Sequence, residues 1–333
     1  MQTRPDGRSP AGGLPAITGD DVRALLSAAQ AADALEQGMR ARTPEQLEGI
    51  PRAVLEVPDR DDPAEMLLMP AFGREGAGLK LVSIVRDNPG RGLPLIQGLY
   101  LLLSAEEMTP ELVIDGAALT GLRTAAVSTL ATRRLARPDC RRMVVFGAGA
   151  QAEAHIDAMC SVLPIEQVTV VGSTPDSPRA HALAERLRAD GLDAATRGPE
   201  AVAGADLICA CTTSSTPLFD DRELTPGVHI NAIGAYRLDM AEIPAETLGR
   251  ALVVVESLEA ALSEAGDIVG AIRSGALPEA GFASTLAEVL GGAAARTSDD
   301  QLTVFKSVGL PAEDLIVARA LADALHAAAA SLS

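Results

Sequence analysis

One stretch of the chain restricts the fold more than any other: a short apolar run, a glycine-rich turn and a helix-forming segment within residues 141–159. Residues 143–146 are too few for a helix but suit a buried parallel strand. Gly147, Gly149 and Ala152 follow in the pattern G-x-G-x-x-A. The first glycine allows a tight turn, the second lets the backbone approach a pyrophosphate, and the alanine lets the helix pack on the strand. The pattern predicts a dinucleotide site with a phosphate at the helix N-terminus.

Composition limits the partners that such a protein can have. The 333 residues are 47% hydrophobic, which is enough for a sizeable core, but only 2% aromatic and without Trp. A net charge of −17 and this scarcity of stacking groups argue against nucleic acid and anionic membrane surfaces as partners. No apolar run reaches the length of a membrane span, and the N-terminus has no signal-peptide core. We therefore expect a cytoplasmic protein.

The four cysteines have neither metal-ligand nor disulfide-framework spacing, and the histidines offer no metal spacing either, so no metal site is expected. Cys209 and Cys211 would share one face of a buried strand, where thiols behave as small core side chains. His155 falls on the predicted nucleotide helix, and a structural role is expected for it.

The first third of the chain predicts a sheet of its own. Residues 1–16 are rich in Gly, Pro and Arg and predict a flexible tail, and Asp20 or Asp21 can cap the helix that follows. Five strands without intervening helices are then expected, at residues 52–57, 64–72, 78–85, 93–103 and 110–116. Such a run indicates an antiparallel sheet, and so a domain of different build from the rest.

Helices and strands alternate in the second part. Thr120 is a candidate N-cap for a helix that ends near Pro138. Further strands are expected at residues 168–172, 206–211, 229–234 and 251–256, and the chain ends in an Ala-rich helix over residues 312–331. The alternation predicts a doubly wound parallel sheet, so the fold class is α/β with an additional α+β domain. The apolar final helix is expected to pack on the first domain or on another subunit.

The residues after the second strand of the parallel sheet bear on the choice of cofactor. An acid at this position binds the ribose 2′-hydroxyl of NAD, whereas the 2′-phosphate of NADP needs neutral or cationic neighbours. Here the strand is followed by Ser173 and Thr174, with Arg179 nearby and Asp176 as the nearest acid. The pattern favours NADPH, and NADH remains the alternative.

Several segments resemble the ornithine cyclodeaminase/μ-crystallin family. They occur in the family's order and cover nearly the whole chain beyond the tail: L-T-G-L-R-T-A-A-V-S (119–128), F-G-A-G-A-Q-A-E-A-H (146–155), T-T-S-S-T-P (212–217), H-I-N-A-I-G-A (229–235), E-A-G-D (264–267) and T-V-F-K-S-V-G (303–309). The resemblance implies a homodimer of subunits that each pair a Rossmann NAD(P)-binding domain, residues 121–304, with a substrate-binding and dimerisation domain built from residues 17–120 and 305–333.

The resemblance also implies that Arg52, Lys80 and Arg123 are the substrate-pocket cations. The two arginines are suited to binding the carboxylate of an amino or imino acid by forked hydrogen bonds. Arg123 is expected in the first turn of its helix, where N–H groups favour an anion. Lys80 is the candidate that protonates or polarises a C=N nitrogen as hydride reaches the carbon.

Two departures from the family pattern bear on the reaction. Ornithine cyclodeaminases carry a Glu where this chain has Leu67 and an Asp where it has Tyr236, so both carboxylates that would act on the amines of a diamino acid are missing. Glu242 and Asp267 lie in segments shared with the family and are expected to be structural or surface acids. Whether Tyr236 contacts substrate or only lines the pocket stays open.

The hydroxyl-rich turn after the strand at 206–211 fits either a ligand site or a simple turn. With the residues that the resemblance adds, the cofactor set is Thr124, Gly147, Gly149, Ala150, Gln151, Ser173, Thr174, Thr212, Thr213, Ser214, Ile233, Gly234 and Ser307. The expected activity is NAD(P)H-dependent reduction of a cyclic imino acid, Δ1-pyrroline-2-carboxylate or Δ1-piperideine-2-carboxylate. Alternatives are an alanine or opine-type dehydrogenase, an ornithine cyclodeaminase, and a nucleotide-dependent binding protein of low turnover.

Overall fold

The computed structural model describes residues 13–57, 64–293 and 295–331, and they form two compact units. Of the described residues, unit 1 comprises 13–27, 49–57, 64–122 and 311–331, and unit 2 comprises 28–48, 123–293 and 295–310. The tail expected over residues 1–16 lies mostly outside the described residues; its last residue, Ala16, begins a strand. Among the described residues, no helix is both long and apolar enough to cross a membrane.

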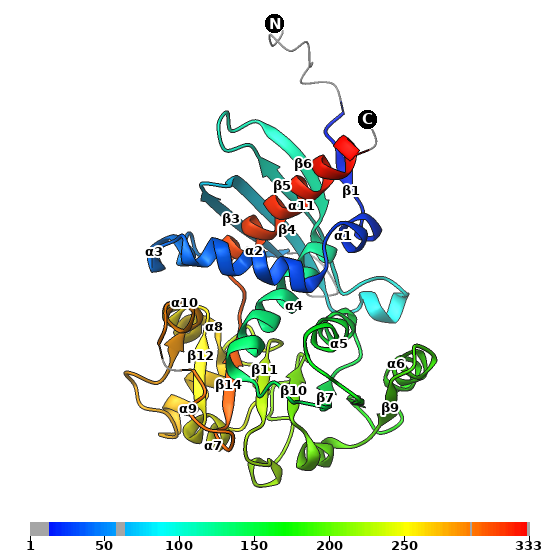
Figure 1. The fold of residues 1–333 in the computed structure, drawn as a ribbon, viewed down its shortest axis with the longest axis vertical. Coiled ribbons are helices and arrows are strands. Elements are labelled where there is room, and N and C mark those ends of the chain that lie inside the picture. Colours follow the sequence, from blue (N-terminus) through cyan, green and yellow to red (C-terminus); the bar gives the residue numbers. More distant parts are fainter. Residues whose placement is uncertain (1–12, 58–63, 294, 332–333) are drawn as a thin grey trace, which may run out of the picture. The chain divides into compact units, whose positions relative to one another are not determined.

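Unit 1 is built on a six-stranded sheet of order β1-β6-β5-β4-β3-β2. The pairs from β2 to β6 are antiparallel, which confirms the predicted antiparallel sheet, and β1 adds to β6 in parallel. Helix α11 packs along β3, β4 and β5 (Figure 1). The elements are β1 (Ala16–Ile17), α1 (Gly19–Leu25), β2 (Ala53–Val57), β3 (Ala64–Gly73), β4 (Gly76–Val85), η1 (Asn88–Arg91), β5 (Ile96–Leu103), β6 (Pro110–Asp115) and α11 (Pro311–Ser331).

Unit 2 contains an eight-stranded, wholly parallel sheet of order β13-β12-β14-β11-β10-β7-β8-β9. Separate apolar cores cover its two faces, as the doubly wound prediction requires. The elements are α2 (Ala28–Arg40), α3 (Pro44–Glu48), β7 (Arg142–Phe146), α5 (Ala150–Val162), β8 (Gln167–Val171), α6 (Pro178–Ala189), β9 (Asp193–Thr196), η2 (Pro199–Gly204), β10 (Leu207–Ala210), η3 (Asp221–Glu223), β11 (His229–Ala232), α7 (Ala245–Arg250), β12 (Leu252–Val255), α8 (Leu258–Glu264), α9 (Gly266–Arg273), β13 (Ser284–Thr285), α10 (Leu286–Leu290) and β14 (Thr303–Lys306).

Two predicted helix starts are wrong. The first helix is capped by Thr18, whose hydroxyl accepts from the Asp21 N–H while Asp21 bonds back to the Thr18 N–H, so Asp21 is the distal member of a capping box. Helix α4 (Gly116–Leu135) begins four residues before Thr120. Asp115 accepts from the first N–H groups of α4, and the Thr120 hydroxyl donates back to the Gly116 carbonyl from inside the helix.

Residues 28–48 group with unit 2, although the sequence assigned them to the first domain. Helix α2 packs on α5 and α10, and its acids form ion pairs with the end of α4. Asp33 pairs with Arg133 and Glu36 with Arg134, each at 2.6 Å. The amphipathic pattern of α2 predicts a helix with one buried face but not which sheet that face covers.

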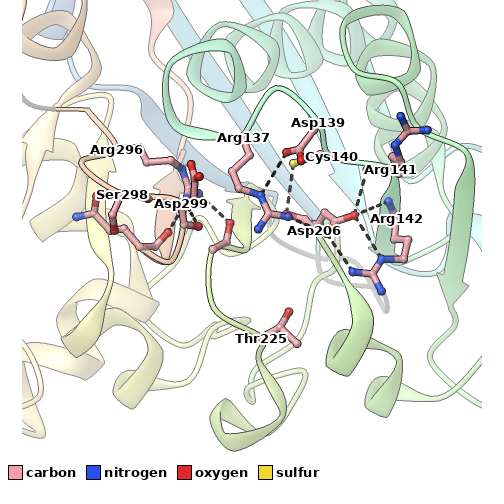
Figure 2. A network of polar contacts seen from close by, with 12 residues as sticks. Arg137, Asp139, Cys140, Arg141, Arg142, Asp206, Thr225, Arg296, Ser298 and Asp299 are labelled. Carbon is pink, nitrogen blue, oxygen red and sulfur yellow. Dashed lines mark hydrogen bonds and ion pairs between the residues drawn. The ribbon is translucent and has the colours of Figure 1, made fainter.

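A polar network ties together the amino end of the parallel sheet. Asp206, just before β10, accepts from the backbone N–H groups of Arg141 and Arg142 and from the guanidinium groups of Arg137 and Arg142 (Figure 2). Partial burial alone would raise the pKa of Asp206, but these hydrogen bonds outweigh burial and lower it. The carboxylate therefore stabilises the fold above the ordinary aspartate pKa, and this contribution disappears as the pH falls through the lowered value.

Replacing Asp206 by Asn is expected to lower the free energy of unfolding by about 2 kcal/mol near neutral pH, because several charge-assisted hydrogen bonds are lost. The difference from the wild type should narrow in acid. Denaturant unfolding at several pH values measures both effects. Asp139→Asn is the control, because this exposed acid only meets Arg137 at 3.5 Å. An Asp206→Asn variant as stable as the control would contradict the account.

Candidate functional site: a nucleotide-binding edge and a buried lysine

The glycine turn after β7 has the geometry that the sequence predicts. Gly147 has φ +102°, and a Cβ there would lie 2.6 Å from the Cys211 carbonyl oxygen, so glycine is required. Gly149 is the N-cap of α5 and supplies no side-chain cap. A Cβ at Gly149 would meet nothing within 4 Å, so the backbone at this helix N-terminus faces open space. An uncapped N-terminus of a 13-residue helix behind an open glycine fits a pyrophosphate.

Most other predicted cofactor residues follow neighbouring strands at the same edge. Because the sheet is parallel, the carboxyl ends of β7, β8, β10, β11 and β14 share one edge. The predicted residues that follow these strands are Gly147, Gly149, Ala150, Gln151, Ser173, Thr174, Thr212, Thr213, Ser214, Ile233, Gly234 and Ser307. Thr124 lies on α4 and is buried. The edge is thus built from chain segments far apart in sequence.

Two buried acids that the sequence expected to be structural or surface groups fix this edge. Glu242 accepts from the N–H and hydroxyl of Thr212 at 2.7 and 2.9 Å and from the N–H groups of Gly234 and Ala235 at 2.7 and 2.9 Å. Asp267 accepts from the Glu242 N–H at 2.6 Å. The Thr212 hydroxyl therefore donates its hydrogen to Glu242 and not to a ligand. Glu242 joins the turns after β10 and β11 into one rigid rim.

The ionisation of Glu242 should affect cofactor binding. Burial raises its pKa to about 7, against the opposing effect of Lys306, whose Nζ lies 2.9 Å from Asp267. A protonated carboxyl cannot accept all four bonds, so the rim should loosen as the pH falls below that value. We expect NADH to bind roughly fivefold more weakly at about pH 6 than at about pH 8, the equivalent of about one hydrogen bond.

Fluorescence titration with NADH measures this dependence without a titrating 2′-phosphate. Glu242→Gln, which cannot change its charge, should bind NADH with the same affinity at both pH values. A wild-type protein whose NADH affinity is equally insensitive to pH would contradict the role of Glu242.

The segment between β14 and α11 is held by another acid that the sequence did not single out. Glu256 accepts from the Ser307 hydroxyl at 2.6 Å and from the N–H groups of Val308 and Gly309 at 3.0 and 2.7 Å. Gly309 has φ +81°, and a Cβ there would lie 2.2 Å from Nη1 of Arg123. Gly309 thus makes room for the guanidinium. Glu256 fixes the backbone against which the buried Arg123 side chain rests.

Arg123 does not lie in the first turn of its helix as expected. Helix α4 starts at Gly116, which places Arg123 well inside it. The helix N-terminal N–H groups are used by Asp115, so they do not assist Arg123 in binding an anion. The guanidinium itself remains a candidate carboxylate ligand. Tyr236, also in unit 2, is half-buried and packs against the apolar core.

The predicted substrate residues of unit 1 lie on one face of its sheet. Leu67 pairs with Val82, two positions along β4 from Lys80, so Leu67 and Lys80 share a face. Arg52 directly precedes β2, whose Val54 pairs with Leu67, and strand alternation places Arg52 on that face as well. This side of β3, β4 and β5 is buried, and α11 packs on these three strands.

Lys80 is almost completely buried and forms an ion pair with Asp314 of α11. Nζ of Lys80 lies 2.9 Å from Oδ1 and 2.7 Å from Oδ2. Arg319, five residues further along the helix, donates two hydrogen bonds of 2.8 Å to Glu111 of β6 and so fixes α11 on the sheet. Sequence reasoning missed Asp314. Its signal was one of two adjacent acids, Glu313 and Asp314, at the start of a helix that is otherwise rich in apolar residues, where a buried charge is costly unless it is paired.

His155, Cys209 and Cys211, for which the sequence predicts structural roles, lie in the interior of unit 2. His155 is buried and bonds to the Gln151 carbonyl and the Ser128 hydroxyl, and burial lowers its pKa to about 4. It is a neutral structural group, as expected. Cys209 and Cys211 are free thiols, and burial raises the pKa of both. No cluster of potential metal ligands occurs among the residues described.

Comparison with known proteins identifies the family. The model of the ornithine cyclodeaminase/mu-crystallin family matches residues 17–329. The chain belongs to this family. It is 38% identical over 262 residues to a Delta(1)-pyrroline-2-carboxylate reductase of Bacillus cereus, covering 77% of this chain and 80% of that protein. Alanine dehydrogenase of Archaeoglobus fulgidus is 30% identical over 91% of this chain and 92% of its own length.

A solved structure extends the comparison to the fold. Thermococcus litoralis Delta(1)-pyrroline-2-carboxylate reductase, in complex with NADH and L-proline, matches with a TM-score of 0.88 and 29% identity. The match covers 95% of this chain and 98% of the other. The fold class predicted from the glycine turn and the strand patterns is thereby confirmed.

Proposed function

We propose that this protein is an NAD(P)H-dependent reductase of a cyclic imino acid, Δ1-pyrroline-2-carboxylate or Δ1-piperideine-2-carboxylate, producing proline or pipecolate. The observation that carries the proposal is the buried Lys80 ammonium, held by Asp314 on the same sheet face as the apolar Leu67. The ammonium can donate the proton that reduction of a C=N bond needs. Leu67 stands where an ornithine cyclodeaminase has a Glu, so this position supplies no carboxylate for reaction of a diamino acid. Relatives named Delta(1)-pyrroline-2-carboxylate reductase support the same activity.

Each candidate residue has a chemical role in this reaction. Arg52 and Arg123 bind the substrate carboxylate through forked, charge-assisted hydrogen bonds. Lys80 donates a proton from Nζ to the ring nitrogen, so that no negative charge accumulates there. The turn after β7 and the N-terminus of α5 hold the pyrophosphate of the dinucleotide. A reduced nicotinamide, when bound, supplies the hydride that the substrate carbon receives.

Ornithine cyclodeamination is less well supported. That reaction needs a base for the attacking amine and a partner for the distal ammonium. Leu67 is buried and apolar, and Tyr236 is a phenol, so neither position supplies a carboxylate. Alanine dehydrogenation is the second candidate, because a relative of that name matches 91% of the chain. The same cations serve a linear imino acid.

We propose NADPH as the preferred cofactor. Ser173 and Thr174, exposed after β8, carry no negative charge that would repel a 2′-phosphate. Arg197 is also exposed and directly follows β9, the strand paired with β8, where its N–H donates to the Val170 carbonyl. A guanidinium at the carboxyl end of the neighbouring strand is suited to a phosphate. We also propose a cytoplasmic location, in keeping with four free cysteines.

We propose further that the protein is a homodimer. The face of the unit 1 sheet opposite α11 is apolar across β3, β4 and β5, yet its side chains are only partly covered. Phe72 is 66% exposed and Leu99 is 43% exposed. The members of this face are Leu68, Pro70, Phe72, Ala77, Leu79, Leu81, Leu99, Leu101 and Leu103. A contiguous apolar face of this kind marks an interaction site, and a second copy presents the same face.

A substrate panel tests the proposed function. NADPH absorbance is followed with Δ1-pyrroline-2-carboxylate, with Δ1-piperideine-2-carboxylate, and with pyruvate plus ammonia or methylamine. Ornithine with NAD is assayed separately for ammonia release. Loss of NADPH with a cyclic imine at a kcat/KM far above that with pyruvate is the expected result. Ammonia from ornithine without imine reduction would refute the interpretation of Leu67 and Tyr236.

A further inference from the structure

Lys80 lies in a row of paired residues that crosses the centre of the unit 1 sheet. The register places Met69, Lys80, Tyr100 and Ile114 side by side on β3, β4, β5 and β6. All four are buried. Helix α11 packs on β3, β4 and β5 and contributes Asp314, which is fully buried, to the Lys80 ammonium. The charged side chain in this row therefore has an opposite charge on the helix that packs against it.

The ion pair is not what the packing of this sheet requires. Two apolar side chains of similar volume stabilise a core as well as a buried ion pair does, or better, because two charges must be removed from water. Neighbours such as Met69 and Ile114 show that the row accommodates apolar groups. The pair therefore points to a chemical use of the charge rather than to stability.

Asp314 is a counter-charge of Lys80, and other titratable groups lie on the elements around it. Across the sheet β5 contributes Tyr100, while Met69 of β3 carries no charge. Burial and the nearby Asp314 raise the pKa of Tyr100, so its phenol stays neutral, and its Oη has no hydrogen-bond partner within the described chain. On α11, Arg319 is engaged by Glu111, and the neighbouring Glu313 is buried. Among the described residues, Asp314 has its carboxylate in direct contact with Nζ of Lys80.

We propose that Asp314 is a positioning residue for Lys80, which fixes the direction of Nζ and keeps the ammonium protonated until substrate accepts the proton. This inference rests on the proposed imine reduction. In that step the C=N π bond breaks, a C–H bond forms with the hydride and an N–H bond forms with the proton from Nζ. Lys80 is left as a neutral amine and takes one proton from solvent before the next turnover. The carboxylate of Asp314 favours that return of the proton because it stabilises the ammonium.

Asp314→Asn tests the positioning role, because it keeps the shape and removes the charge. We expect its kcat for the cyclic imine to fall roughly a hundredfold, as for a misplaced general acid. The high-pH limb of its kcat/KM profile should move to lower pH, because the ammonium loses its counter-charge. NADPH affinity, measured by fluorescence titration, should stay unchanged. Tyr100→Phe, which removes only the neighbouring hydroxyl, should keep the wild-type high-pH limb.

The outcomes separate the two proposals. If the wild type does not reduce either cyclic imine, the proposed function fails and the role of Asp314 fails with it. If the wild type reduces an imine and Asp314→Asn has the same kcat and the same pH profile, only the positioning role is refuted. Should Asp314→Asn not fold, Asp314→Glu replaces it. This variant keeps the negative charge but displaces Nζ of Lys80. We therefore expect a lower kcat, with the high-pH limb of the kcat/KM profile at the same pH as in the wild type. An unchanged kcat would overturn the inference.

Discussion

Replacing Lys80 by Met is expected to lower kcat/KM for the cyclic imine by about a thousandfold, within the range that a general acid contributes. Methionine matches the length of the lysine stem but cannot donate a proton. NADPH should bind as in the wild type, because the glycine turn and the rim around Glu242 belong to unit 2. Stopped-flow measurement of NADPH oxidation, with fluorescence titration of NADPH, provides both quantities.

The Lys80→Met variant should also be less stable, because Asp314 stays buried but loses its ion pair with Lys80, at a cost of about 3 kcal/mol. A double variant, Lys80→Met with Asp314→Leu, is the matched control. It should recover the lost stability while remaining inactive, which separates the chemical role of Lys80 from its role in packing. A Lys80→Met protein that keeps kcat/KM within tenfold of the wild type would contradict the assignment of Lys80 as proton donor.

Introducing charge into the apolar outer face of the unit 1 sheet is expected to convert a dimer into a monomer. Phe72→Glu combined with Leu99→Glu places two carboxylates on the face that we propose as the dimer interface, one near the end of β3 and one within β5. Burying unpaired like charges costs several kcal/mol, so the dissociation constant should rise by about a thousandfold or more. Both side chains are exposed, Phe72 by 66% and Leu99 by 43%, so the fold of the monomer should persist.

Sedimentation velocity at a series of protein concentrations measures this change. Leu262→Glu is the control, because Leu262 is similarly exposed at 45% but lies on α8 of unit 2. The control should sediment as the wild type does. A wild-type protein that is monomeric throughout, or a double variant that dimerises as tightly as the control, would contradict the proposed interface.

The sequence predicted elements well wherever local periodicity decides the structure. The five antiparallel strands, the glycine turn after β7 and the final helix all have strong local patterns, and each occurs as predicted within a few residues. Strand β14 was not predicted, although it lies between β11 and β12 in the centre of the parallel sheet. It is only four residues long and ends in Lys306, so neither its length nor its composition marked it as buried.

The errors at the site arise where a distant partner decides the role of a residue. Thr120 has the right chemistry for an N-cap, but Asp115 lies closer to the true start of α4 and takes that role. The importance of Asp314 and Glu256 depends on contacts with residues that are distant in the sequence. Asp314 contacts Lys80, 234 positions away, and Glu256 contacts Ser307, 51 positions away. Local propensity contains no information about such pairs. The family resemblance suggested the role of Lys80 but not the partner that supports it.

Transfer of deuterium from the cofactor to the substrate tests the proposed imine reduction. The protein is incubated with Δ1-pyrroline-2-carboxylate and NADPH that carries deuterium at both C4 positions of the nicotinamide, and the product is analysed by mass spectrometry and NMR. We expect proline with a single deuterium at C2, because hydride reaches the carbon of the C=N bond while the proton on nitrogen comes from Lys80 and exchanges with solvent. Unlabelled proline, or no proline while pyruvate and ammonia give deuterated alanine, would contradict it.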